Sequence, residues 1–484
     1  MNTLKKKTTW SRRLNKNTDS IIFDKFDFRL YWHDIKFYIA HAKMLEIVGL
    51  LKIKESKIII NELKNIEKDI NKIKRNWFIK KEDAHMNIEA LFIKKIESIE
   101  KKLHIGKACS NVFYTAIRLY LREKLDKIKL KITKLRTNLI KLAISESDTI
   151  MPGFAQFKIA QHPITFGHHV LAWHEMIYRD HLRLLECRQR INTFPLGLGS
   201  AALITGTTNL TSKYAIIKDL LGFDHITENY LDAVSDRDFA LEFTSFSSIL
   251  LMHLSRMCKE ILLWTNLHFD FIEIPDYLYL CTGSSLLLSQ PQHPYIPDLI
   301  RCKTGRIYGN LLNVFVLMTS QPLFTYKKDI QEEKEILFDT TETVINCIES
   351  FINFIKALKI KPQKMYLSAL CNYSTATGTG FYEYLVKKKC NVHLNDDHYL
   401  ALSMVSKVVF YGNTNNKKIN KLKEIYMENL RQVQFYNKID KAFLDILTLE
   451  GFVNTQSHIG GTSPNQVRSA ALRATKYLKK DLLG

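Results

Sequence analysis

Apolar residues in the middle of the chain are separated by steps of four or three residues over more than three heptads. This spacing places them on one side of a single long helix, and such an apolar seam needs other helices to cover it. A fold built around long, packed helices is therefore predicted. We expect a bundle shared between subunits, with a self-contained bundle as the alternative. The seam consists of Ile117, Leu121, Leu125, Ile128, Ile132, Leu135, Leu139 and Leu142.

Helical periodicity recurs on both sides of this seam. The chain holds only 18 Gly and 10 Pro among 484 residues, which is too few turn formers for a β-rich fold. We predict an all-α fold with an N-terminal helical domain at 1–110, a central long-helix bundle at 111–361 and a small C-terminal helical domain at 362–484. The further segments with a helical pattern are 26–51, 54–77, 163–189, 241–267, 299–316 and 330–359.

A polar loop separates two of these helical segments. It opens with a Gly-Ser-Ser turn at Gly283, where φ > 0 is accessible, and Pro291, Pro294 and Pro297 prevent regular structure because proline has no amide donor. A Ser-bearing loop between rigid helices is a typical place for chemistry. The alternative is a solvated connection between helices.

Basic residues outnumber acidic ones by 70 to 49, which gives a net charge of +21. Phosphate binding needs such a charge, so a nucleic-acid partner has to be considered. However, the lysines are scattered among Ile, Asn and Leu along every predicted helix, and no aromatic residues alternate with them as a stacking platform requires. We expect a solvated Lys-rich surface and no nucleic-acid partner. The joint richness in Lys, Ile and Asn fits amino-acid usage in an AT-rich genome.

The eight cysteines are dispersed, without a Cys-x-x-Cys pair or zinc-type spacing, so we expect no metal site. No apolar run reaches the roughly 18 residues that span a bilayer, so we expect no membrane partner. Without a secretory pattern, the expectation is a cytoplasmic protein with reduced thiols. The basic start of the chain around Trp10 leaves a transit-like segment as an alternative.

Several segments, in order along the chain, resemble argininosuccinate lyase. The similarity runs collinearly from about residue 26 to the end, through all three predicted regions. The segments that carry it are Thr149-Ile-Met-Pro-Gly153, Ile164-Thr-Phe-Gly-His-His169, 227–239, Cys281-Thr-Gly-Ser-Ser285, 299–309, 326–335 and Gly460-Gly-Thr-Ser-Pro464.

This resemblance implies the aspartase/fumarase superfamily, an all-α homotetramer around a long central bundle, with each active site assembled from three subunits. It also implies a small-molecule substrate, argininosuccinate, and no metal or cofactor. In the family reaction a base removes a Cβ proton and an aci-carboxylate carbanion forms. The C–N bond then breaks as the guanidino group is protonated, which releases arginine and fumarate.

The same resemblance assigns roles to residues of this chain. Ser284 occupies the position of the family's catalytic base. Gln156 occupies the position of the family's proton-carrying His, and Asp298 corresponds to the acidic residue that orients this His in the family. The substrate-binding positions are Asp83, His85, Ser110, Asn111, Tyr326, Gln331 and Lys334.

The chain departs from the family pattern at several of these places. Pro291-Gln292-His293 replaces a Lys-Lys-Asn run in a loop one residue longer, and Gln156 is an amide that does not titrate. An inserted His162 is expected to lie almost two helical turns from Gln156 and not to replace the lost His. Of two family cations near residues 107–112 only Lys107 remains, and Lys327 replaces an Asn.

The function implied is that of an argininosuccinate lyase in arginine biosynthesis, with an eroded and slow active site. Loss of a general acid or base costs roughly 10²–10⁴-fold in rate. The main alternative is a catalytically silent relative that serves as a structural or binding protein. A sister reaction on another fumarate-releasing substrate is a weaker third hypothesis.

Overall fold

The computed structural model describes residues 27–68, 88–89, 100–103, 105, 109–156, 159–195, 210–275, 294–319, 327–371 and 448–483. The chain divides into two compact units. Unit 1 comprises Met1–Leu130, Leu182–Ile249 and Gly305–Asn346, and unit 2 comprises Lys131–His181, Leu250–Thr304 and Cys347–Gly484.

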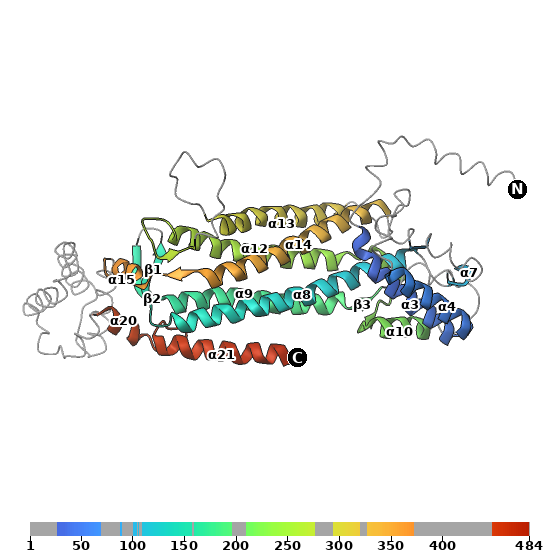
Figure 1. Cartoon of the computed structure of the whole chain (residues 1–484), viewed down its shortest axis with the longest axis horizontal. Helices are drawn as coiled ribbons and strands as arrows, with labels where there is room; N and C mark the ends of the chain where they lie inside the picture. The colour runs from blue at the N-terminus through green and yellow to red at the C-terminus, as the bar shows by residue number, and fades with distance from the viewer. Residues whose placement is uncertain are drawn as a thin grey trace, which may run out of the picture. The chain divides into compact units, whose positions relative to one another are not determined.

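Long helices dominate both units, which confirms the predicted all-α class (Figure 1). Within the described residues the predicted helices are present, and the ends that are described differ by a few residues from the prediction because capping and tertiary contacts decide where a helix stops. The long helices are α8 (Cys109–Ser145), α9 (Phe166–Ile191), α12 (Asp238–Trp264), α13 (Tyr295–Thr319) and α14 (Lys327–Ala357).

The apolar seam lies on α8 and is covered by the chain's own residues. Seven of its eight side chains are buried, from Ile117 to Leu139, and Leu142 is half-buried. A single chain therefore already covers most of this seam. That the bundle is shared between subunits stays a prediction.

In unit 1, the N-terminal helices pack around a shared apolar core. After a 3-10 turn, η2 (Asp27–Leu30), α3 (Tyr31–Ile47) lies against α4 (Ile53–Lys68) and α10 (Leu210–Leu221) (Figure 1). The chain leaves α3 through Gly49, whose φ of +77° favours glycine. The remaining short elements of this unit are α7 (Glu100–Leu103), α11 (Tyr230–Ser235), and the parallel pair β3 (Thr193–Phe194) and β4 (His225–Ile226).

In unit 2, a hairpin precedes α9 where the sequence predicted a helix from residue 163. Strand β1 (Ile150–Gln156) pairs antiparallel with β2 (Ile159–Thr165). The hairpin depends on Gly153, because a Cβ there would lie 2.5 Å from the carbonyl oxygen of His162. Residues 159–165 pair with β1 as a strand, so α9 begins only at Phe166.

The hairpin packs on the C-terminal elements of unit 2. Ile150 shares a small apolar core with Ala369 of α15 (Pro362–Cys371) and with Leu449 and Val453 of α20 (Leu449–Thr455). The final helix, α21 (Pro464–Leu483), begins at Pro464. The last pair of strands is β5 (Ile272–Glu273) and β6 (Lys359–Ile360). The three-region division of the chain stays a prediction.

No helix among the described residues is both long and apolar enough to cross a membrane.

Candidate functional site

The predicted site residues are distributed over both units. Ser284, Asp83, His85 and Tyr326 lie outside the described residues. Ser110 and Asn111 occupy the first turn of α8, Gln331 lies on α14, and Gln156 ends β1. The side chains of Asp298 and Lys334 are described, and each has a defined neighbour.

Lys334 lies on α14 in unit 1 and is only 1% exposed. Its Nζ lies 5.2 Å from the ring centroid of Phe113 on α8, a cation–π distance. Phe113 follows Asn111 by two positions on α8. The structure thus brings α14, which carries Gln331 and Lys334, next to the helix that carries Ser110 and Asn111.

Asp298 lies in the first turn of α13 in unit 2. Its Oδ1 accepts hydrogen bonds from Arg301 Nε at 3.0 Å and from Arg301 Nη2 at 2.8 Å. An acidic residue in the first turn also suits the helix dipole. The carboxylate is therefore held by its own helix. Its predicted role towards residue 156 stays a prediction.

The inserted His162 lies on a strand and not on a helix. It pairs with Gly153 across the hairpin, and its ring stacks on Phe452 of α20 at 5.8 Å between centroids. The prediction that almost two helical turns separate it from Gln156 is wrong, because both residues lie on paired strands, β1 and β2, with two register shifts between the strands.

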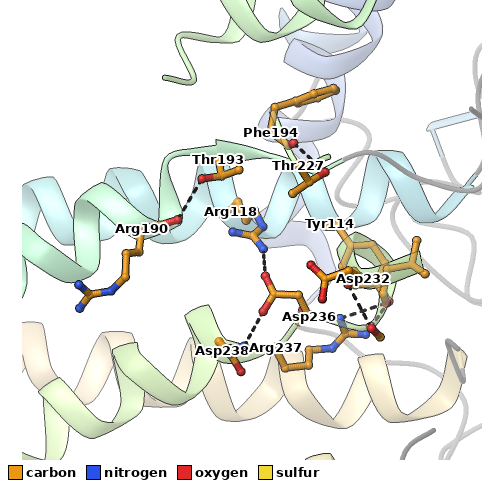
Figure 2. A network of polar contacts seen from close by, with 12 residues as sticks. Tyr114, Arg118, Arg190, Thr193, Phe194, Thr227, Asp232, Asp236, Arg237 and Asp238 are labelled. Carbon is orange, nitrogen blue, oxygen red and sulfur yellow. Dashed lines mark hydrogen bonds and ion pairs between the residues drawn. The ribbon is translucent and has the colours of Figure 1, made fainter. Parts of the chain in front are cut away.

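A buried polar network in unit 1 surrounds two adjacent residues, Asp236 and Arg237, between α11 and α12 (Figure 2). Asn229 caps α11 by accepting from the amides of Leu231 and Asp232, which brings the chain to this turn. Asp236 Oδ1 then accepts from the amide of Asp238, at 2.8 Å, at the start of α12.

Asp236 binds α8 through Arg118. The Arg118 Nη2 group donates to Asp236 Oδ2, and the guanidinium stacks on Phe239 at 4.4 Å. Burial lowers the pKa of Arg118, and the Asp236 carboxylate opposes this shift. This ion pair fastens α8 to the start of α12.

Arg237 binds both α8 and α14. Its Nη2 donates to Tyr114 Oη at 2.5 Å, its guanidinium lies 4.5 Å from the Tyr114 ring, and its Nε lies 2.6 Å from Glu333 Oε2 in an ion pair. Desolvation alone would lower the pKa of Arg237, but Glu333, Tyr114 and Asp236 together raise it. Desolvation raises the pKa of Glu333 to about 7, against the opposing effect of Arg237.

The sequence alone predicts no site at Asp236 or Arg237. Residues 227–239 provide only evidence of resemblance there. Asp236-Arg237-Asp238 is a run of charged residues at a helix start, which is the one local signal for this network. Its partners Arg118 and Glu333 lie about a hundred positions away on either side, and no periodicity links them.

Two polar cavities occur beside α3 and α8 in unit 1, with volumes of about 880 and 440 Å³. Both are lined by His33, Lys36 and Glu123, and neither is lined by a predicted site residue. Within the described part of the chain, no group of three or more His, Cys, Asp or Glu side chains is placed to hold a metal ion.

The comparisons with known proteins agree with this architecture. A family model described as "Lyase" matches residues 7–309. The argininosuccinate lyase of Chromohalobacter salexigens is 46% identical over 97% of both chains, and that of Pseudomonas aeruginosa is 43% identical over 99% of both chains.

Solved structures show the same fold at low sequence identity. EDDS lyase in complex with formate has a TM-score of 0.75 at 21% identity, covering 94% of this chain and 87% of its own. The 3-carboxy-cis,cis-muconate lactonizing enzyme of Pseudomonas putida has a TM-score of 0.71 at 16% identity, covering 98% and 99%. With relatives this similar over nearly their full length, the chain belongs to the argininosuccinate lyase family of lyases.

Proposed function

We propose that this protein eliminates fumarate from argininosuccinate and so releases arginine, as a step of arginine biosynthesis. The observation that carries the proposal is the identity of 43–46% with argininosuccinate lyases, over 97% or more of this chain, in two relatives. The contact between Lys334 and Phe113 supports it, because it joins two helices that hold substrate-binding positions.

In the proposed reaction, Ser284 removes the Cβ proton of argininosuccinate. The electron pair left on carbon is delocalised into the adjacent carboxylate as an aci-carboxylate. Collapse of this intermediate forms the C=C bond of fumarate and breaks the C–N bond, while the leaving guanidino nitrogen gains a proton. The positions Asp83, His85, Ser110, Asn111, Tyr326, Gln331 and Lys334 bind the substrate.

The proposed rate is low, because two roles are filled by unusual residues. Gln156 can orient the substrate through its amide, but it can neither release nor accept a proton near neutral pH. Pro291-Gln292-His293 lacks the cation that a developing aci-carboxylate needs, and an absent oxyanion donor costs about 10²–10³-fold. Asp298 remains as a carboxylate at the start of α13.

The proposed assembly is a homotetramer. Its support is an apolar stripe on α13 in unit 1, made of Tyr308, Leu312, Phe315 and Val316. These residues recur at the spacing of one helix face, and Leu312 is 64% exposed and Val316 58% exposed. An exposed helix face of this kind is typical of a subunit interface. We place the enzyme in the cytoplasm, where its cysteines stay reduced.

The proposal is tested by incubating the purified full-length protein with argininosuccinate and following fumarate by its ultraviolet absorbance. We expect slow release of fumarate that depends on enzyme concentration. Ser284→Ala should abolish it, and the neighbouring Ser285→Ala serves as the matched control. Absence of fumarate at high enzyme concentration from the wild type would instead support the catalytically silent alternative.

A further inference from the structure

Asp236 and Arg237 connect two helices that carry predicted substrate-binding residues. Asp236 contacts Arg118 on α8, and Arg237 contacts both Tyr114 on α8 and Glu333 on α14. We propose that these two residues are positioning residues of the active site, which hold the first turns of α8 and α14 at one spacing and one rotation. This inference rests on the proposed function.

The guanidinium of Arg237 has several fixed partners. Its Nη2 donates to Tyr114, and its Nη1 donates to the carbonyl oxygens of Asp236, at 2.9 Å, and Val234, at 3.4 Å. Its Nε lies against Glu333 in an ion pair and makes no hydrogen bond within the described part of the chain. Arg237 is only 2% exposed. A planar group with this many fixed partners has one orientation, and the flexible ammonium of a lysine cannot reproduce it.

The contacts on α8 lie close to the residues they would orient. Asn111 precedes Tyr114 by one helical turn and Arg118 by two, so the three positions fall on the same side of α8. Both Arg118 and Tyr114 are buried and bound to the same turn. The rotation of α8 about its axis, and with it the place of Asn111, is therefore set from Asp236 and Arg237.

On α14 the link is equally short. Glu333 precedes Lys334 directly, and Gln331 lies one turn before Lys334. Glu333 is 6% exposed and contacts Arg237, while Lys334 points its Nζ to the Phe113 ring on α8. A shift at Glu333 would therefore rotate the positions of Gln331 and Lys334 as well.

Buried ion pairs contribute little net stability compared with apolar residues of similar volume, because desolvation offsets their attraction. Their contribution here is geometric: Arg237 fixes a distance and an angle between α8 and α14 that apolar packing alone would leave adjustable. A merely structural role predicts a loss of stability alone. A positioning role predicts a change at Lys334 and in substrate affinity.

The test compares Arg237→Lys and Glu333→Gln with matched controls in the full-length protein. Arg136→Lys alters a different buried arginine, which lies on α8 and donates to Asp481 at 2.8 Å in unit 2. Glu332→Gln alters the exposed neighbour of Glu333. Thermal unfolding establishes that each variant is folded. If Arg237→Lys does not fold, Glu333→Gln and Asp236→Asn carry the same comparison.

The first readout is the rate at which acetic anhydride modifies Lys334 in the native protein, followed by peptide mass spectrometry. We expect this rate to rise at least about tenfold in Arg237→Lys and Glu333→Gln, because local opening then exposes the amine, and to stay unchanged in both controls. The second readout is the steady-state kinetics of fumarate release. We expect KM to rise about tenfold or more, with a smaller fall in kcat, because binding residues are displaced.

Suppose that the Arg237 and Glu333 variants have a lower melting temperature, but that Lys334 is labelled at the wild-type rate and KM is unchanged. This result would overturn the positioning role while the proposed function stands. If the wild-type protein releases no fumarate but the labelling changes as expected, the proposed function fails and the positioning geometry stands.

Discussion

Arg237 Nε lies 2.6 Å from Glu333 Oε2, with both side chains buried, so the turn before α12 is joined to α14 by an ion pair removed from water. Lys334, the next residue on α14, is a predicted substrate-binding residue. In the sequence, residues 227–239 provided only evidence of resemblance. The ion pair connects this segment to the part of unit 1 where substrate binding is proposed.

The Arg237–Glu333 pair makes stability depend on pH in a definite direction. Burial raises the pKa of Glu333 from 4.5 to about 7. In the unfolded chain this carboxyl ionises near 4.5, so between these two values the folded protein holds a proton that the unfolded chain has lost. The free energy of unfolding therefore falls as pH rises through this window.

Glu333→Gln removes this dependence, because the amide does not titrate. Relative to the variant, the wild type should lose up to about 3 kcal/mol of unfolding free energy between pH 4.5 and pH 7.5. Urea unfolding of both proteins across this range measures the difference, with Glu332→Gln as the control. Parallel pH curves for wild type and Glu333→Gln would contradict the raised pKa.

His33 changes the free energy of unfolding with pH in the direction opposite to Glu333, so that stability falls as the pH falls. It is buried in unit 1 with Nε2 3.2 Å from Glu123 Oε2, and burial lowers its pKa to about 4, although Glu123 opposes the shift and Lys36 adds to it. Above pH 6.5 the imidazole is neutral in the folded and the unfolded protein, so the free energy of unfolding carries no penalty from His33. Between 6.5 and 4 only the unfolded chain takes up the proton, so stability is lost as pH falls.

His33→Gln should abolish this loss, which amounts to about 3 kcal/mol at most. The measurement is the urea midpoint of wild type and variant between pH 7 and pH 4. His225→Gln, at an exposed histidine of β4, is the control. A wild type and a His33→Gln variant that lose stability equally on acidification would show that His33 is not the group responsible.

Gln156→His should raise the rate of fumarate release. The substitution restores the residue type that the resemblance places at the end of β1, and a titratable group there can carry a proton that the amide cannot. Because general acid–base catalysis contributes about 10²–10⁴-fold, we expect a gain of at least tenfold in kcat. The pH profile should also gain a step near pH 6.5, the ordinary pKa of His.

The control for this gain is Gln161→His, a second Gln-to-His change in the same hairpin, which should leave kcat and its pH profile unchanged. Equal rates in the Gln156→His and wild-type proteins would show that residue 156 carries no proton in this enzyme.

Leu312→Asp should break the proposed tetramer. Leu312 lies at the centre of the exposed apolar stripe on α13, and a carboxylate there would have to lose its water on association. We expect the mass measured by light scattering to fall from that of a tetramer to that of a smaller species. Leu267→Asp is the control, because Leu267 is 85% exposed and outside the stripe. A wild-type mass for Leu312→Asp would exclude this face as an interface.

The sequence alone determined the helical class and the approximate position of every long described helix, because helical periodicity is a local property of the chain. The seam from Ile117 to Leu142 marked α8. Collinear short motifs were enough to identify the superfamily. Through the same resemblance, Lys334 and Gln331 were placed on one helix as substrate-binding positions.

Tertiary structure decided what those residues meet. The seam on α8 is covered within one chain, Gly153 and His162 face each other across a hairpin, and Arg237 reaches both Tyr114 and Glu333. Such contacts join residues far apart in sequence and depend on the packing of whole helices, which leaves no periodic trace. For the same reason the raised pKa of Glu333 could not be predicted, since burial and the distance to Arg237 exist only in the folded chain.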